Sequence, residues 1–417
     1  MGMAVDGAAT VPMDDYPQFG GVHPETAALT NVLAARQVVA PHTGQPFSEA
    51  MVFGVGGGLG MGYILWEFGQ HRGQRDARVL VLAFQNSWQY SDRFVETTCK
   101  RLGMRFHVST TGSAKVAARA LDDALVRSEP AVAWVDGASM PYLQLPEAMK
   151  GHFAHVVAAC GRAGTDVLVD DLAIQPFAVP AEVLAEARAR IPSFKHRLLT
   201  VEGADGVDLG AAITEGLAAC VENLGSGSES FGLAALRKWA RLMTDGGAGK
   251  GWPVVFKDRR GLYGALSSVF EATEVHGAPG GLRGLYGQFL LEAADATNNS
   301  RLREPAAHYA ALAHGWNALA DSALPDTVAP FKRSKDILRE RHRARMAGGD
   351  AWRATARLTA ELDAIGSECD REFPLDDREV SALFGGLRNR LIALHQAEVA
   401  ALESLRRSLP SRQSSVK

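Results

Sequence analysis

The stretch His155-Val-Val-Ala-Ala-Cys-Gly161, followed closely by Asp166-Val-Leu-Val-Asp170, indicates the fold class of the first half of the chain. Both runs are short, apolar and rich in β-branched residues, and a glycine-containing turn separates them, so they predict a hairpin of two buried strands. Further strands are predicted at residues 78–84, 105–109, 130–136 and 197–202, and helices at 25–38, 91–102, 113–127 and 180–191. Helices come first and the hairpin comes late, which favours an α+β layer fold rather than a doubly wound sheet.

The pattern changes near residue 206. Strand signals nearly vanish beyond this point, and helical periodicity continues to Leu409. Residues 380–405 have the spacing of one long amphipathic helix, which makes a homodimer plausible. We therefore expect a flexible N-terminus at 1–16, a first domain at 17–205, a helical domain at 206–409 and a disordered tail at 410–417.

Composition excludes several classes of protein. The chain has 417 residues, 47% of them hydrophobic and 22% charged, and a net charge of −3, so no basic field points to nucleic acid. No apolar run approaches the roughly 20 residues that span a bilayer, and the acidic N-terminus does not look like a secretory signal. The four cysteines are scattered without metal-ligand spacing. We expect a cytoplasmic protein with free thiols, no membrane or nucleic-acid partner, no cofactor and no metal.

A glycine-rich stretch at Gly54-Val-Gly-Gly-Gly-Leu-Gly-Met-Gly62 is a candidate nucleotide loop. No Gly-Lys-Ser or Gly-Lys-Thr ends it, it lacks GxGxxG spacing, and no clear strand leads into it. Close packing of the backbone, or a glycine-rich turn beside a site, explains the glycines better.

Two segments carry residues suited to papain-like chemistry. Such enzymes place a nucleophile at a helix N-terminus, where the helix dipole stabilises an anion, with a glutamine six residues upstream. Gln18 precedes Pro24 by six residues at the start of the first predicted helix, but proline cannot act as a nucleophile. His155 begins one predicted strand and Asp171 follows the next, so the two can meet as a general base and its orienting carboxylate.

These segments together resemble the butirosin-biosynthesis acyltransferase family, with a helical C-terminal domain of unknown function. The matching motifs are His23-Pro24-Glu25-Thr26, Ser48-Glu49 to Gly54, Gly56 to Gly62, Trp134-Val-Asp136, Leu145-Pro146, His152-Phe-Ala-His155 and Asp170-Asp171-Leu-Ala173 in the first part, and Phe231-Gly-Leu, Lys238-Trp239-Ala, Gly251-Trp-Pro253, Arg283, Tyr286 and Phe289 to Glu292 in the second. The resemblance covers roughly residues 17–320. It implies a papain-like first domain whose cysteine accepts an acyl group from a carrier-protein thioester and passes it to an amine.

Carried over by position, the resemblance implies His155 as the base, Asp171 as its orienting residue and Gln18 as an oxyanion donor. Pro24 occupies the place of the catalytic cysteine. We therefore expect an enzyme of natural-product biosynthesis that carries out acyl transfer, cyclisation or hydrolysis by non-covalent acid–base catalysis. Glu25 and His23 lie beside the position from which the cysteine is missing. An acyl carrier protein and a small amine or polyketide-like substrate are the expected partners. A binding or scaffold relative without activity is the alternative, and a hydrolase using Cys160 or Cys99 is a third, weaker one.

Three residues of the helical domain, Arg283, Tyr286 and Glu292, are candidates for substrate binding. Packing at i, i+3 spacing and a salt bridge between domains is the alternative that we favour for them. The basic run from Lys332 to Arg345 is typical of a solvated helix face, although it would also suit an acidic carrier protein.

Overall fold

The fold was obtained as a computed structural model, which describes residues 16–71, 74–275 and 277–409. Its contacts divide the chain into two compact units, each assembled from three segments. The first unit takes Met1–Val52, Leu102–Val207 and Glu340–Thr359, and the second takes Phe53–Arg101, Asp208–Arg339 and Ala360–Lys417. This grouping differs from the expected division at residues 205/206 in two segments, 53–101 and 340–359. The predictions of a flexible N-terminus and a disordered tail fall, apart from Tyr16, outside the described residues.

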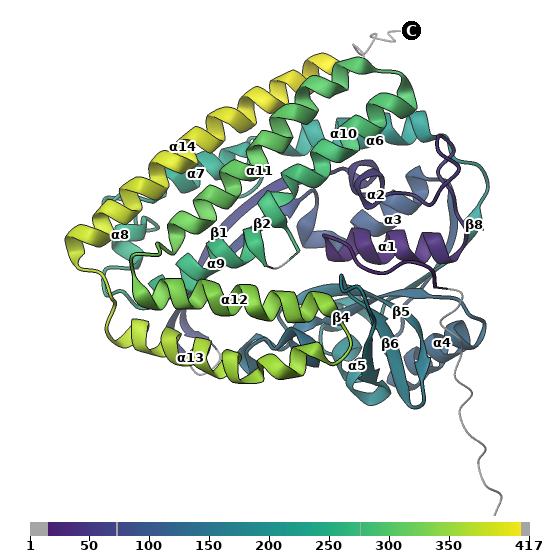
Figure 1. The fold of residues 1–417 in the computed structure, drawn as a ribbon, viewed down its shortest axis with the longest axis horizontal. Helices are drawn as coiled ribbons and strands as arrows, with labels where there is room; N and C mark the ends of the chain where they lie inside the picture. The colour runs from purple at the N-terminus through teal and green to yellow at the C-terminus, as the bar shows by residue number, and fades with distance from the viewer. Residues whose placement is uncertain (1–15, 72–73, 276, 410–417) are drawn as a thin grey trace, which may run out of the picture. The chain divides into compact units, whose positions relative to one another are not determined.

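The first unit is built on an antiparallel sheet with the strand order β3-β8-β4-β5-β6-β7, part of which is labelled in Figure 1. Its elements are α1 (Pro24–Ala35), β3 (Met104–Ser109), α4 (Ala114–Val126), β4 (Ala131–Asp136), β5 (Ala154–Ala163), β6 (Asp166–Asp170), β7 (Phe177–Pro180), α5 (Ala181–Ala189) and β8 (Leu198–Ala204). The predicted hairpin is the pair β5 and β6. The α+β fold class is confirmed, with a sheet in the N-terminal region and a helical C-terminal region.

A core of apolar side chains covers one face of this sheet. Leu121 and Leu125 of α4 and Leu184 of α5 are buried with Val157 of β5 and Val169 of β6. At roughly 25 cal/mol per Å² of apolar surface, each such side chain contributes about 2 kcal/mol when it is fully buried. Strand β7, which the sequence did not predict, has only four residues and ends at a proline that begins the next helix.

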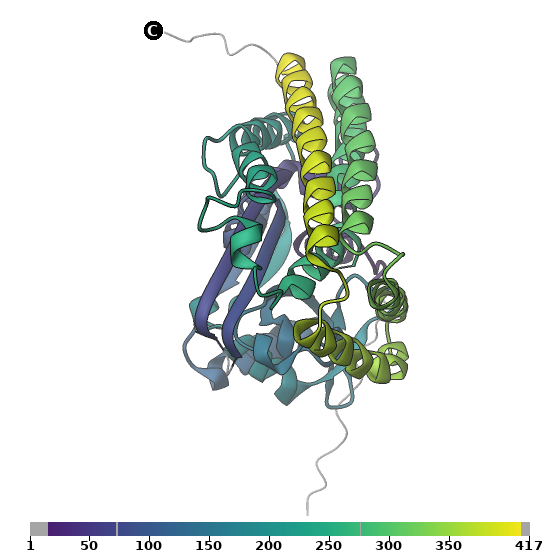
Figure 2. The ribbon, with the colours of Figure 1, turned by 90° about the vertical axis from the view of Figure 1, so that its left-hand side faces the viewer.

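The second unit contains a long hairpin and most of the helices. Its elements are β1 (Leu59–His71), β2 (Gln74–Gln85), α3 (Ser91–Arg101), α6 (Leu209–Leu224), α7 (Leu233–Leu242), α8 (Trp252–Val255), α9 (Leu262–Glu274), α10 (Arg283–Thr297), α11 (Arg303–Ala323) and α14 (Asp377–Ser408). Helix α14, drawn in yellow, runs beside α11 in both Figure 1 and Figure 2. The single long helix expected at 380–405 is therefore present. Among the described residues no strand follows β8, as the periodicity predicted.

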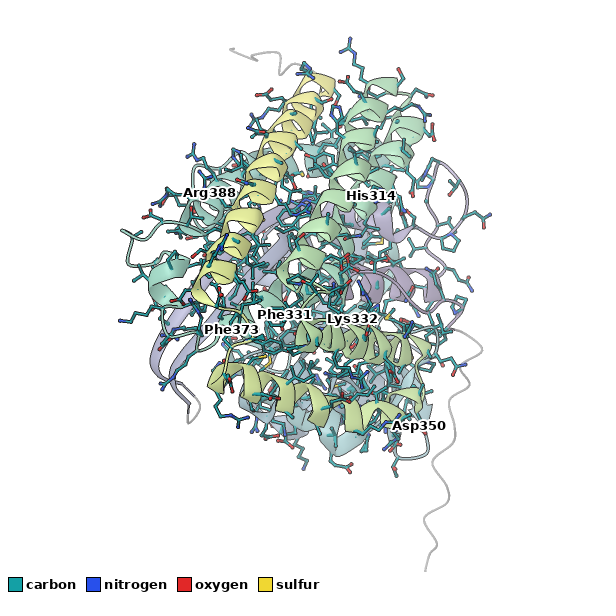
Figure 3. The ribbon with its side chains drawn as sticks, turned by 60° about the vertical axis from the view of Figure 1, so that its left-hand side comes forward. His314, Phe331, Lys332, Asp350, Phe373 and Arg388 are labelled. Atoms are coloured by element: carbon teal, nitrogen blue, oxygen red, sulfur yellow. The ribbon has the colours of Figure 1, made fainter. Side chains whose placement is uncertain are left out.

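Three further helices run through segments assigned to both units: α2 (Glu49–Gly56), α12 (Ala329–Ala347) and α13 (Ala356–Arg371). The N-terminal half of α12 carries part of the basic run. Lys332, labelled in Figure 3, is 3.0 Å from Asp336, and the buried Lys335 is 3.1 Å from Asp321. The charges of these two residues are thus balanced within the second unit. Within the described residues, no helix has the length and apolar character needed to cross a membrane.

The glycine-rich stretch spans the end of α2, a turn and the start of β1, so the expectation of a simple turn missed a strand. A side chain at Gly54 would meet the ring of Phe289, and one at Gly58, where φ is +59°, would meet Tyr286. Close packing of the backbone, the reading preferred to a nucleotide loop, accounts for these two glycines.

Candidate active site

His155 and Asp171 form a buried pair at the ends of neighbouring strands. Asp170, the last residue of β6, is in register with Ala158 of β5, so the next residue lies beside the start of β5. His155 Nε2 is 2.8 Å from Asp171 Oδ2, and both side chains are almost wholly buried. An ionised carboxylate can only accept a hydrogen bond, so Nε2 carries the proton and Nδ1 is left as the basic atom. The predicted meeting of these two residues is confirmed.

Tyr142 and Arg345 hold Asp171 in its charged form. The Tyr142 hydroxyl donates to Asp171 Oδ2 at 2.9 Å. Burial would raise the pKa of Asp171, but attraction to His155, its hydrogen bond and the Arg345 guanidinium together bring that pKa below the ordinary value. The sequence offered no signal for Tyr142, which lies 29 positions before Asp171. Arg345 was expected on a solvated basic helix face, but it is buried and its charge acts on Asp171.

The neighbouring carboxyl group, Asp170, reaches different partners. Its Oδ2 accepts hydrogen bonds from the Tyr16 hydroxyl at 2.6 Å and from Asn31 of α1 at 2.7 Å. Burial, partly offset by these hydrogen bonds, raises the pKa of Asp170 to about 7. Asn31 also donates to the Gly20 carbonyl at 3.0 Å.

These contacts fix the segment that carries Gln18. Tyr16 and Gly20, at either end of the segment, are both tied to the Asp170–Asn31 network, and Gly20 lies near the carbonyls of Leu172 and Ala173. Gln18 itself is half-buried. The structure thus brings the predicted oxyanion donor onto a segment that packs beside the residues following Asp171.

The start of α1 carries the other three predicted positions. Pro24 is the first residue of the helix, His23 is its N-cap without a side-chain capping bond, and His23 Nε2 is 3.2 Å from Glu25 Oε2. His23 Nδ1 is 3.3 Å from the Thr26 hydroxyl. The two residues predicted beside the position of the missing cysteine, His23 and Glu25, are therefore in contact with each other.

Glu49 closes the N-terminus of α1, a role that the sequence did not reveal. Its carboxylate accepts from the backbone N–H groups of Val22 and His23 and from the Thr26 hydroxyl, each at 2.8 Å. Burial raises the pKa of Glu49 despite these hydrogen bonds. The Ser48-Glu49 motif was visible, but nothing in one sequence pairs Glu49 with residues 23 to 27 positions away.

The thiols do not support a cysteine nucleophile. Burial raises the pKa of Cys99 to about 12 and raises that of Cys160 further, so neither is a thiolate near neutral pH. Cys160 donates to the Leu168 carbonyl at 3.4 Å. In the described part of the chain no three His, Cys, Asp or Glu residues lie close enough together to hold a metal.

The three candidates of the helical domain lie in α10. Arg283 is wholly buried; its Nε donates to Glu398 at 2.7 Å and its Nη2 to the Gly60 carbonyl at 3.3 Å. Tyr286 is wholly buried against Gly58, whereas Glu292 is half-buried. The salt bridge of Arg283 lies inside the second unit, not between domains. Substrate binding by these residues stays a prediction.

Fold and site define an α+β protein with a hydrogen-bonded His–Asp pair, and comparison with known families agrees. Residues 23–172 match the family described as Butirosin biosynthesis protein H, N-terminal, and residues 182–329 match Domain of unknown function (DUF4872). The N-terminal module of the chain thus matches the butirosin biosynthesis protein H family, and the domain of unknown function follows it. A search of curated proteins found no match.

Proposed function

We propose that this protein is an acyltransferase-like enzyme of natural-product biosynthesis that works by non-covalent acid–base catalysis in a papain-like first domain. The observation that carries the proposal is the buried His155–Asp171 pair, whose 2.8 Å hydrogen bond at Nε2 leaves Nδ1 as the basic atom of the ring. The family adds the setting, since its first module is named for a biosynthetic pathway, and the resemblance to acyltransferases supports acyl transfer as the reaction. His155 is the general base and Asp171 its orienting residue.

The reaction balances without a covalent enzyme intermediate. An amine nitrogen attacks the carbonyl carbon of an acyl thioester, preferably one held by an acyl carrier protein, and His155 Nδ1 takes the proton that the amine loses. The C–S bond then breaks, and the proton passes to the departing sulfur. A nitrogen or oxygen of the acyl chain itself gives cyclisation, and water gives hydrolysis.

Residues near Pro24 take supporting roles in this proposal. Gln18 donates a hydrogen bond to the oxygen that becomes negative during attack. His23 and Glu25, which lie 3.2 Å apart, supply a second acid–base group beside the position from which the cysteine is missing. In this proposal the enzyme holds the amine and the thioester in the reactive geometry, so that no covalent nucleophile of the enzyme is needed.

The test is thioester turnover by the full-length protein. Acyl-N-acetylcysteamine thioesters are incubated with a panel of primary amines, and thiol release and amide formation are both measured. We expect His155→Ala and Asp171→Asn to lower the rate about 10²–10⁴-fold, the usual contribution of a positioned base. His107→Ala, an exposed histidine of β3, is the matched control and should keep full activity. Equal rates in His155→Ala and wild type would refute the proposal.

A binding or scaffold relative is the second candidate, and Pro24 is the observation that favours it. Proline at the first position of α1 removes both a nucleophile and a backbone N–H from the helix N-terminus. This candidate expects no native turnover and new thioester reactivity in Pro24→Cys. Acylation of Pro24→Cys, seen by mass spectrometry, together with an inert native protein would support it, whereas native turnover would exclude it.

A further inference from the structure

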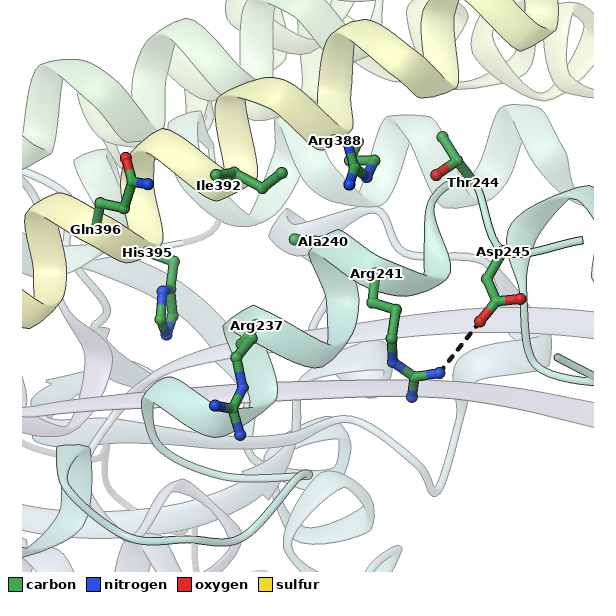
Figure 4. A pocket seen from close by; sticks show the side chains of 9 residues that line it. All are labelled: Arg237, Ala240, Arg241, Thr244, Asp245, Arg388, Ile392, His395 and Gln396. Carbon is green, nitrogen blue, oxygen red and sulfur yellow. Dashed lines mark hydrogen bonds and ion pairs between the residues drawn. The ribbon is translucent and has the colours of Figure 1, made fainter. Parts of the chain in front are cut away.

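A pocket of about 440 Å³ lies between α7 and α14 of the second unit (Figure 4). Arg237 and Arg241 line one side, one helical turn apart, and Asp245 follows α7. Arg388, Ile392 and His395 line the other side from successive turns of α14. The i, i+4 and i, i+7 spacings place each group on one face of its helix.

The charges around this pocket are not balanced by protein groups. Asp245 is the one acidic residue in the lining, and it is 3.2 Å from Arg241. Its other oxygen accepts from the backbone N–H groups of Gly247 and Ala248, so its position is fixed. Within the described residues Arg237 and Arg388 have no hydrogen-bond or ion-pair partner. Three guanidinium groups against one carboxylate leave a net charge of +2 before His395 is counted.

His395 lies beside this excess of positive charge, and its pKa is lowered. Burial first, and then the nearby Arg237, lower the pKa of His395, while the buried Glu398 acts in the opposite direction. Glu398 is already hydrogen-bonded by Arg283 and by Trp316, so it does not neutralise the arginines of the pocket. Gathering like charges in a partly buried pocket costs free energy that a bound anion would offset.

We propose that this pocket binds the phosphate group of a small phosphorylated molecule. Guanidinium groups bind phosphate oxygens in pairs of parallel hydrogen bonds, and a phosphate monoester carries a charge of about −2 near neutral pH, which matches the net charge of the lining. The side chains of Ala240 and Ile392 supply apolar surface for the carbon part of such a ligand. The site is independent of the His155–Asp171 pair and of the proposed reaction.

The experiment titrates full-length protein with phenyl phosphate at fixed ionic strength by isothermal calorimetry. We expect saturable 1:1 binding. We also expect a loss of at least about tenfold in affinity for Arg237→Gln with Arg388→Gln, because the variant loses the charge-assisted hydrogen bonds of two guanidinium groups. Phosphate binding should also raise the pKa of His395, which an NMR titration with and without the ligand measures.

The matched control is the double variant Arg378→Gln with Arg390→Gln. It also removes two positive charges, but from exposed positions of α14 outside the pocket, and should bind phenyl phosphate like wild type. Thermal unfolding of both double variants shows that they are folded. Absence of saturable binding in the millimolar range, equal weakening by the control pair, or succinate binding as tight as that of phenyl phosphate would each overturn the proposal.

Discussion

Adjacent carboxyl groups in this protein have opposite pKa shifts. Asp171 is held ionised by His155, Tyr142 and Arg345, while burial outweighs the hydrogen bonds of Asp170 and raises its pKa to about 7. Asp171 therefore serves as the charged partner of a base. Its neighbour Asp170 holds the N-terminal segment by hydrogen bonds and carries a proton below about pH 7. Environment, not residue type, sets the two roles.

Asp170 makes the stability of the protein depend on pH. The folded state keeps the proton of Asp170 up to pH about 7, whereas the unfolded chain releases it near the ordinary carboxyl pKa of 3.8. The contribution to stability is therefore complete below the lower pKa and is lost as pH rises through the upper one. The difference corresponds to up to about 4 kcal/mol in the free energy of unfolding. Asp170→Asn, which keeps an acceptor for Tyr16 and Asn31, should gain stability relative to wild type across this range in urea titrations.

Asp123→Asn, at an exposed position of α4, is the control for this measurement. It should track wild type over the same range of pH. A difference between Asp170→Asn and wild type that stays constant with pH would mean that Asp170 is ionised in the folded protein.

The sequence predicted the central pair of the site but not its surroundings. His155 and Asp171 lie at the ends of two strands joined by one short turn, so their meeting follows from local pattern. The roles of Tyr142, Arg345 and Glu49 depend on contacts between segments that are far apart in the chain. A single sequence does not show which distant segments meet. Their roles needed the folded arrangement.

At the scale of elements, helix α1 begins without a cap of its own. His23 makes no side-chain capping bond, and the buried carboxylate of Glu49 supplies acceptors for two backbone N–H groups and a hydroxyl. The helix dipole also stabilises a negative charge near a helix N-terminus. The start of α1 therefore depends on a residue from the next helix.

Glu49→Ala should lower the free energy of unfolding by about 1–3 kcal/mol, because the partly buried N–H donors of Val22 and His23 lose their acceptor. Chemical denaturation measures the change, and Glu186→Ala, an exposed position of α5, is the control. Equal small losses in both variants would show that water replaces Glu49 at no cost.

Most elements were predictable because their periodicity is strong, and the exceptions have physical causes. Strand β1 was missed because glycines at its start, placed by the packing of Phe289 and Tyr286, hid the strand pattern of the residues that follow. Strand β7 was missed because four residues ending in proline give too short a pattern. Tertiary packing decided both.

At the scale of the whole molecule, neither compact unit is a continuous piece of chain. The first unit needs residues 340–359, which bind it through the Ile174 N–H to Met346 carbonyl bond at 3.0 Å and through the 2.7 Å hydrogen bond from Gln144 to the Trp352 carbonyl. A shift from strand to helix patterns marks the end of the first domain near residue 206. The periodicity of the sequence does not reveal that residues 340–359 pack with the first unit.

A fragment ending at Val207 should therefore fail to fold as a unit. It lacks residues 340–359 and carries residues 53–101 without the rest of the second unit. We expect broad, non-cooperative thermal unfolding by circular dichroism, against a cooperative transition for the full chain measured in parallel. A sharp transition in the fragment would show that the first 207 residues are a self-sufficient domain.

The return of residues 340–359 to the first unit also sets an order of events during synthesis. After residue 207 leaves the ribosome, the sheet with His155 and Asp171 must wait until residue 359 has emerged, which takes roughly 8–30 s at elongation rates of about 5–20 residues per second. During that interval the incomplete sheet exposes apolar surface to other nascent chains and to chaperones. The cell thus has to shelter this protein until nearly all of it has been made.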